Sequence, residues 1–182
     1  DDGSTAMEVA LKMAFEVARR KRPGSRPRFL SLDGAYHGDT VGAVSLGHID
    51  LFHKAYQPLL FKTDSVMAPA CYRCPHNKAR AERGDARSYR KCHWECVDRI
   101  EKKLVARNQK GDPHAGMVVE PLVQGAAGIV AHPEGWLRRV AGLLKQIDVP
   151  LIADEVMTGF GRTGIRDLAN RDPNAEPVLF AS

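Results

Sequence analysis

The arrangement of short apolar runs constrains the fold of this chain most strongly. Runs at 28–32, 117–121 and 150–154 have the length of strands, and segments with helical spacing lie between them. The later runs carry no alternating polar residues, which is typical of strands buried on both faces of a sheet. Strands that alternate with helices predict an α/β domain with a mostly parallel sheet and flanking helices. A chain of 182 residues is long enough to bury the core of one such domain.

The first helix is expected to begin at a capping hydroxyl and to bury one apolar stripe. Ser4 or Thr5 can cap it, and Glu8 stands where a capping-box partner of Thr5 belongs. The stripe of the first helix comprises Ala6, Val9, Ala10, Met13, Ala14 and Val17.

Farther along the chain, we expect a loop over 58–91, an irregular stretch over 167–176, and no helix or strand after it that closes the fold.

Charge and composition exclude several classes of protein. The net charge of +5 arises largely from the stretches 19–28 and 78–91, which lack the interleaved aromatic residues of a single-strand nucleic-acid platform. No apolar run approaches the ~20 residues of a membrane span, and no signal segment is visible. The four cysteines cluster instead of forming a framework along the chain. We therefore expect a cytoplasmic protein that binds neither nucleic acid nor membrane.

Polar residues at strand and helix ends supply the candidate chemistry. Gly3-Ser4-Thr5 opens a helix, where free backbone N–H groups and the helix dipole favour an anion; a plain helix cap is the alternative. Asp154 and Glu155 end one buried run and Glu120 ends another, so we expect these carboxylates along one sheet edge. Taken alone, they could also be solvated loop side chains.

Tyr36-His37-Gly38-Asp39 lies just beyond the run at 28–32. A planar cofactor could stack on its aromatic ring. Alternatively, the segment supplies a core tyrosine and a hydrogen-bonded histidine.

Taken together, these segments resemble class III aminotransferases, which are fold type I enzymes that use pyridoxal 5′-phosphate (PLP). The resemblance covers Asp1 to Gly164. It rests on Asp-x-Gly-Ser-Thr-Ala-x-Glu, Tyr-His-Gly-Asp-Thr, Glu-Pro-x-x-Gln-Gly and Ala-Asp-Glu-Val-x-Thr-Gly-Phe-Gly-Arg-Thr-Gly, in that order. It implies that residues 1–182 form part of the large PLP-binding domain, with a cysteine-containing insertion at about 68–96 and without the small domain.

The resemblance also implies a role for each matching residue. Gly3 and Ser4 match the phosphate-binding turn. Tyr36 matches the residue that covers the cofactor ring and lines the substrate pocket, with His37 beside it. Asp154 matches the aspartate that keeps the pyridinium nitrogen protonated. The remaining matches are Val156, on the other face of the ring, and Glu120 and Gln124, which border its hydroxyl side.

Finer features resemble the adenosylmethionine–8-amino-7-oxononanoate branch of the family. These features are Gly-Ala-Val-Ser after the tyrosine motif, and Cys-Tyr-Arg-Cys-Pro followed by Cys-x-x-x-Cys. The branch implies transfer of an amino group from S-adenosylmethionine to 8-amino-7-oxononanoate, which gives 7,8-diaminononanoate for biotin synthesis. Another ω-amino acid or amine aminotransferase of class III is the alternative. The family also implies a homodimer.

The Schiff-base lysine of the family is absent, because no lysine follows Lys145. We interpret the chain as truncated just before that lysine and expect it to be inactive by itself.

Cys71-x-x-Cys74 and Cys92-x-x-x-Cys96 have spacing that a four-thiolate zinc site could use, with His76 and His93 as substitute ligands. This would favour a metal-stapled, non-catalytic module. Zinc knuckles, however, usually have glycine or a tight turn after each pair, and here Pro75 and Trp94 follow. A free-thiol or redox-sensitive loop is the other interpretation.

Overall fold

The computed structural model describes residues 2–79, 90–163 and 179–181. A parallel sheet forms its centre, and the order of its described strands is β2-β1-β3-β6-β7. Each neighbouring pair is parallel, so all carboxyl ends of these strands lie at one edge. The strands are β1 (Arg28–Leu32), β2 (Asp64–Val66), β3 (His114–Val119), β6 (Leu151–Asp154) and β7 (Leu179–Ala181). The prediction of an α/β fold with a mostly parallel sheet is confirmed.

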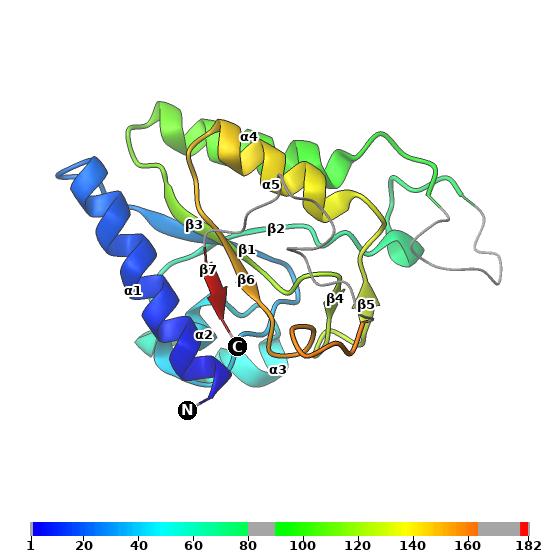
Figure 1. The fold of residues 1–182 in the computed structure, drawn as a ribbon, viewed down its shortest axis with the longest axis horizontal. Coiled ribbons are helices and arrows are strands. Elements are labelled where there is room, and N and C mark those ends of the chain that lie inside the picture. The colour runs from blue at the N-terminus through cyan, green and yellow to red at the C-terminus, as the bar shows by residue number, and fades with distance from the viewer. Residues whose placement is uncertain (1, 80–89, 164–178, 182) are drawn as a thin grey trace.

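Helices cover both faces of the sheet (Figure 1). Side chains of α4 and α5 pack against one face around Trp136 and Ile100, whereas α1 packs against the other around Met7 and Leu11. Successive strand residues therefore point into different clusters, as in a sheet buried on both sides. The helices are α1 (Gly3–Lys21), α2 (Val41–Leu46), α3 (Asp50–His53), α4 (Glu95–Gln109) and α5 (Trp136–Gln146). The short elements are the 3₁₀ helices η1 (Lys54–Leu59) and η2 (Cys71–Arg73), and the hairpin of β4 (Val123–Gln124) and β5 (Val130–Ala131).

The predicted cap of the first helix is wrong. Asp2 caps α1, because its carboxylate accepts a hydrogen bond from the Thr5 backbone N–H at 2.8 Å. Glu8 makes no capping box. Its carboxylate instead accepts from the Gly42 N–H at 2.7 Å and thereby ties α1 to α2.

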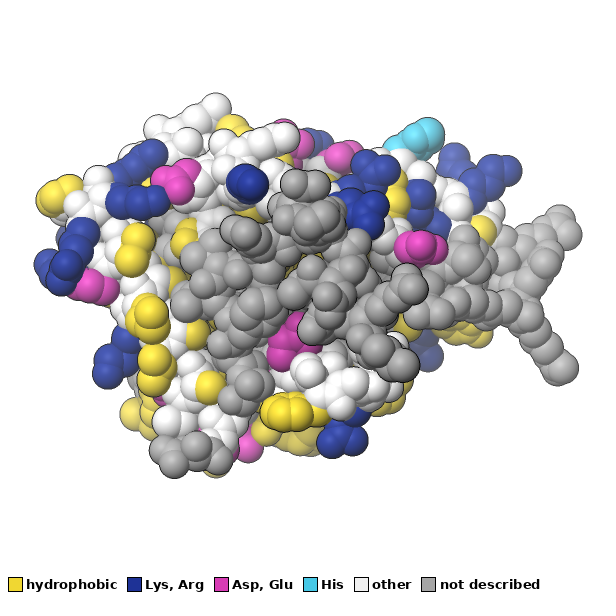
Figure 2. Space-filling model, viewed as in Figure 1, with side chains coloured by type: hydrophobic (Ala, Val, Ile, Leu, Met, Phe, Trp, Pro, Cys, Tyr) yellow, Lys and Arg dark blue, Asp and Glu magenta, His cyan; other side chains and the backbone are white. Residues whose placement is uncertain are grey.

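The predicted apolar stripe of α1 is only partly right, because Ala10 and Ala14 lie on the face that packs on the sheet but Val9, Met13 and Val17 do not. The buried residues are Met7, Ala10, Leu11 and Ala14. Val9, Met13 and Val17 are 52%, 52% and 47% exposed. Hydrophobic side chains accordingly lie along α1 at the left of the molecular surface (Figure 2). Met7 and Leu11 lie on the face of the helix that packs against β3 and β6.

Two strands of the central sheet were missed, as was the short β4–β5 hairpin. Residues 58–91 were expected to be loop, yet β2 lies within that range and pairs with β1. The expectation of no closing element is wrong as well, since β7 pairs with β6 and places Ala181 opposite Asp154. Both strands have only three residues, too few for a clear periodic signal. The residues expected to be irregular, 167–176, lie outside the described part of the chain.

The amino edge of the sheet carries its own polar network. The Asp64 carboxylate lies 3.0 Å from Nε2 of His114 and accepts from Arg28 at 3.3 Å. The His114 ring is fully buried, and burial lowers its pKa to about 4.

No helix within the described ranges is both long and apolar enough to cross a membrane.

Candidate functional site

A buried histidine–aspartate pair lies at the carboxyl edge of the sheet. Asp154 is the last residue of β6, and His37 lies in the loop after β1. His37 Nδ1 is 2.7 Å from Asp154 Oδ2, and the two side chains are 0% and 7% exposed. The other carboxylate oxygen accepts from the Val156 N–H at 3.2 Å. His37 Nε2 is buried and has no partner among the described residues.

Glu120 lies beside this pair and accepts hydrogen bonds from the backbone of the loop that carries Tyr36 and His37. Its carboxylate accepts from the backbone N–H of Tyr36 at 3.2 Å and of Gly125 at 2.8 Å. Burial raises the pKa of Glu120, an effect that the Gly125 N–H opposes and the neighbouring Asp154 reinforces. The expectation that Glu120, Asp154 and Glu155 share one edge is confirmed. All three are less than a tenth exposed, so they are not solvated loop carboxylates.

The start of α1 packs closely against the same edge. A Cβ atom added to Gly3 would lie 2.2 Å from Val156 Cγ2, and one added to Gly38 would lie 2.1 Å from Ser4 Oγ. Gly38 also has φ = +112°, which side-chain-bearing residues rarely adopt. The glycines therefore allow the helix start to approach both the His37 loop and the segment after Asp154. Val156 itself is half exposed.

The start of α1 is suited to binding an anion, although one of its backbone N–H groups already donates to Asp2. Its N–H groups and dipole favour negative charge, and the Ser4 hydroxyl lies beside them. The Asp2 carboxylate already accepts from the Thr5 N–H. The Ser4 N–H also interacts with this carboxylate, so a phosphate bound here would compete with Asp2.

Tyr36 is held by aromatic and polar neighbours. Its hydroxyl donates to Asp39 at 2.8 Å, and this hydrogen bond raises its pKa. The His53 ring is nearly parallel to its ring, with centroids 6.2 Å apart, and Phe52 meets it edge-on. The sequence does not predict the role of His53, because its only signal is a histidine at the end of an apolar and aromatic run.

Gln124 is fully buried beside the site. It donates to the Asp33 carbonyl at 3.1 Å, and its Oε1 lies 3.4 Å from His132 Nε2. Thr158 donates to the Glu155 carboxylate just after Asp154. These contacts fix the loops that flank the histidine–aspartate pair.

The cysteine segments lie away from this edge, beyond β2 and at the start of α4. Cys71 and Cys96 are buried, and all four cysteines are free thiols. Burial, followed by the nearby thiols, raises the pKa of Cys71 to about 11 and of Cys96 to about 12. In the described part of the chain, no three histidine, cysteine or acidic side chains are already arranged to hold a metal ion.

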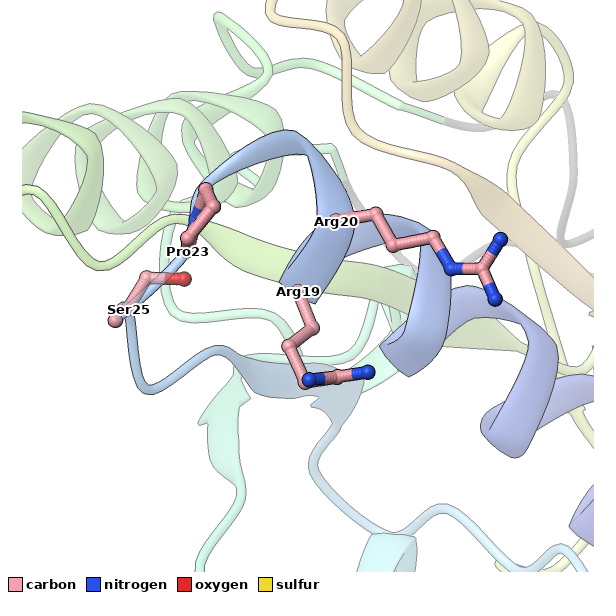
Figure 3. Close-up of a pocket in the computed structure, with 5 residues that line it drawn as sticks. Arg19, Arg20, Pro23 and Ser25 are labelled. Atoms are coloured by element: carbon pink, nitrogen blue, oxygen red, sulfur yellow. The ribbon is translucent and has the colours of Figure 1, made fainter.

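A surface hollow at the far end of α1 is a weaker candidate. Arg19, Arg20, Pro23, Gly24 and Ser25 line it (Figure 3). Both arginines already pair with Glu16, at 2.9 and 2.7 Å. Their positive charge is therefore partly neutralised, and the hollow is open to solvent.

The carboxyl edge thus combines a helix start suited to an anion with a buried carboxylate held by a histidine. In parallel α/β sheets this edge is where ligands bind. A phosphorylated ring with a basic nitrogen fits both features, because the helix start favours the phosphate and the carboxylate favours a protonated nitrogen. The fold is that of an α/β domain, and such domains bind ligands at this edge.

The model of the class III aminotransferase family matches residues 1–170. The chain belongs to the class III aminotransferase family, whose cofactor is PLP.

Among curated relatives, the adenosylmethionine-8-amino-7-oxononanoate aminotransferase of Geobacter sulfurreducens is 45% identical over the whole chain, which spans 38% of that protein. The Staphylococcus aureus protein of the same name is 40% identical over 90% of the chain and 34% of its own length. The chain therefore spans little more than a third of the length of these relatives.

Solved structures share the fold. The enzyme of that name from Methanocaldococcus jannaschii aligns with a TM-score of 0.67 and 33% identity, over 90% of this chain and 32% of its own. A PLP-bound amine transaminase from an uncultivated Pseudomonas species aligns with a TM-score of 0.70 and 33% identity, over 88% and 34%.

Proposed function

We propose that the full-length protein transfers an amino group from S-adenosylmethionine to 8-amino-7-oxononanoate, with PLP bound at the carboxyl edge. The relatives named above support this substrate pair. The observation that carries the proposal is the buried Asp154–His37 pair beside the Gly3-Ser4 helix start. When bound, PLP supplies an electron sink that lets bonds at the amino-bearing carbon break.

Each matched residue has a task that follows from its position. The Asp154 carboxylate holds a proton on the ring nitrogen, and His37 orients that carboxylate through its 2.7 Å contact. Gly3 and Ser4 bind the phosphate. Tyr36, half-buried beside Glu120, covers the ring and borders the substrate.

Two further positions complete the proposed pocket. Val156 lies against Gly3 and contacts the other face of the ring. Glu120 borders the hydroxyl side of the ring, where the backbone N–H groups of Tyr36 and Gly125 hold its carboxylate in place.

The proposed turnover belongs to the full-length protein. The reaction needs a positioned amine, and no lysine follows Lys145 in this sequence. We further propose a cytoplasmic homodimer. The four free thiols fit a reducing compartment, and light scattering of the full-length protein would measure its oligomeric state.

Replacement of Asp154 by Ala in the full-length protein tests the assigned role. We expect transamination to fall by about a hundredfold to a thousandfold, because a preorganised charge at the reacting group is worth roughly 3–4 kcal/mol. Asp148→Ala is the matched control, since that aspartate is exposed and forms an ion pair with Lys21, far from the site. Near-normal turnover of the Asp154 variant would refute the role.

The substrate assignment has its own test. Full-length protein is assayed with S-adenosylmethionine as donor, and with 8-amino-7-oxononanoate or a simple keto acid as acceptor. Preference for the first acceptor supports the proposal. Efficient turnover of simple amines and keto acids alone would favour the amine aminotransferase alternative, which the similarity to the Pseudomonas enzyme keeps as the second candidate.

A further inference from the structure

His53, the last residue of the short helix α3, faces the ring of Tyr36. Its side chain is buried, with 5% of its surface exposed. The two rings are inclined by 17° and their centroids lie 6.2 Å apart, which is the offset, nearly parallel arrangement that aromatic pairs favour. Phe52 meets the same tyrosine ring edge-on, at a centroid distance of 5.8 Å. The reaction proposed above uses Tyr36 but gives His53 no task.

A backbone hydrogen bond fixes which nitrogen of His53 carries the proton. The Ile49 N–H donates to Nδ1 at 3.0 Å, so Nδ1 is the bare nitrogen and the proton of the neutral ring is on Nε2. A second proton, on Nδ1, would set two donors against each other. Burial also lowers the pKa of His53, although Asp39 and Asp50 oppose this effect. The ring that faces Tyr36 is therefore neutral.

Gly47 leaves the space that this ring occupies. A Cβ atom added to Gly47 would lie 2.1 Å from Cε1 of His53 and 2.5 Å from its Nε2. Nε2 is buried and has no hydrogen-bond partner among the described residues. A buried donor without a partner is rare and unfavourable. This indicates that the ring is kept at this position for a reason other than a hydrogen bond from Nε2.

The hydrogen bonds of Tyr36 do not determine the plane of its ring. Its backbone N–H donates to Glu120 at 3.2 Å, and its hydroxyl donates to Asp39 at 2.8 Å. Rotation about the Cβ–Cγ bond moves neither the backbone nor the hydroxyl oxygen, and this torsion of tyrosine has a broad energy profile. The plane of the ring therefore depends on the rings that pack against it, of which His53 is the nearly parallel one.

From the nearly parallel rings and the fixed tautomer, we propose that His53 is a positioning residue that sets the plane of the Tyr36 ring. One face of the tyrosine ring is turned towards His53, so a coenzyme that Tyr36 covers lies against the opposite face. His53 itself touches neither coenzyme nor substrate. This inference rests on the proposed function only for the place of Tyr36 beside both.

Two substitutions in the full-length protein separate the ring of His53 from its hydrogen bond. His53→Asn removes the ring, and the amide oxygen that it introduces takes the place of Nδ1 as acceptor for the Ile49 N–H. His53→Phe keeps a flat ring and removes the acceptor. Lys54→Asn is the matched control, since it introduces the same amide at the neighbouring, exposed position.

The circular dichroism of bound PLP reports the plane of Tyr36, because an aromatic ring packed on the coenzyme at a fixed angle contributes to that band. We expect the band to change in His53→Asn and to match wild type in His53→Phe and Lys54→Asn. The value of kcat/KM for the amino acceptor should fall by at least about tenfold in His53→Asn alone, since small misplacements of a positioned group have effects of this size.

Hydrogen exchange of the coenzyme-free proteins gives a second readout. The Ile49 amide should exchange slowly in wild type and in His53→Asn, and faster in His53→Phe. The proposal is overturned if dichroism and kcat/KM follow this hydrogen bond instead of the ring, or if the two His53 variants behave alike. If His53→Phe does not fold because the larger ring crowds Gly47, an unchanged dichroism band in His53→Asn overturns the proposal.

Failure of the proposed function is distinguishable from failure of this inference. A wild-type protein that binds PLP but does not use the proposed substrates would refute the substrate pair. The dichroism of the bound coenzyme requires no turnover, so the comparison of the His53 variants would still decide whether the ring positions Tyr36.

Discussion

Gly38→Ala perturbs the closest contact between the start of α1 and the His37 loop. The added Cβ would lie 2.1 Å from Ser4 Oγ, 2.8 Å from Ser4 Cβ and 3.1 Å from Ser4 Cα, so rotating the serine hydroxyl cannot relieve the overlap. The positive φ costs about 1–2 kcal/mol once a side chain is present. Overlap with a packed neighbour adds about 1–3 kcal/mol. The structure therefore predicts a total loss of about 2–5 kcal/mol, and a displacement of Ser4.

Gly24→Ala is the matched control. Gly24 also has positive φ, +85°, yet a Cβ there would meet nothing within 4 Å. The Gly24→Ala substitution should therefore lower the free energy of unfolding only by the cost of the positive φ, about 1–2 kcal/mol. Thermal unfolding and PLP titration of the full-length variants separate the two effects. We expect Gly38→Ala to unfold at a lower temperature than Gly24→Ala and to bind PLP at least about tenfold more weakly, which corresponds to about 1.4 kcal/mol. Equal unfolding temperatures and unchanged PLP affinity in the two variants would contradict the close packing of Ser4 on Gly38.

Two further predictions concern buried histidines. His37→Phe removes the 2.7 Å contact with Asp154 and should lower kcat by about tenfold or more, since a hydrogen bond to a charged group contributes about 1.5–3 kcal/mol. His37→Gln, whose amide can donate to Asp154, should recover part of the loss. If both variants were as active as the wild type, a positioning role for His37 would be excluded. Burial lowers the pKa of His114 from 6.5 to about 4 in the folded chain. The neutral ring therefore stabilises the fold above pH 6.5, and stability is lost as pH falls from 6.5 towards 4, by up to about 1.4 kcal/mol per pH unit. Urea unfolding at several pH values should show a shallower decline for His114→Gln, and an unchanged slope would contradict this assignment.

The short apolar runs predicted the central strands well, because their length suits strands, and prolines such as Pro121 and Pro150 bound them. Runs at 117–121 and 150–154 became β3 and β6, and 28–32 became β1. The three-residue edge strands β2 and β7 could not be predicted in the same way. Their pairing depends on a neighbour that is already in place, and not on a local periodic signal.

The face of α1 illustrates a different limit. Small and large apolar residues occur on two sides of this helix, so spacing alone does not choose between Met7-Leu11 and Val9-Met13. Contact with β3 and β6 makes the choice. Likewise, Asp2 and Ser4 are both good caps in isolation, and only the folded backbone shows that the Asp2 carboxylate accepts the hydrogen bond.

The candidate site was predictable wherever a residue follows a strand directly. Asp154 and Glu120 end buried runs, and the topology of a parallel sheet brings such ends together. His53 could not be found this way, because it reaches Tyr36 from a separate short helix. The left-handed backbone conformation of Trp94 was equally hidden, since it leaves no signature in the sequence.

The position of the coenzyme in the full-length protein tests the central claim most directly. A crystal structure with PLP bound should place its phosphate at the Gly3-Ser4 helix start and its ring nitrogen within hydrogen-bond distance of the Asp154 carboxylate. A phosphate bound elsewhere, or a ring nitrogen that does not contact Asp154, would contradict the account.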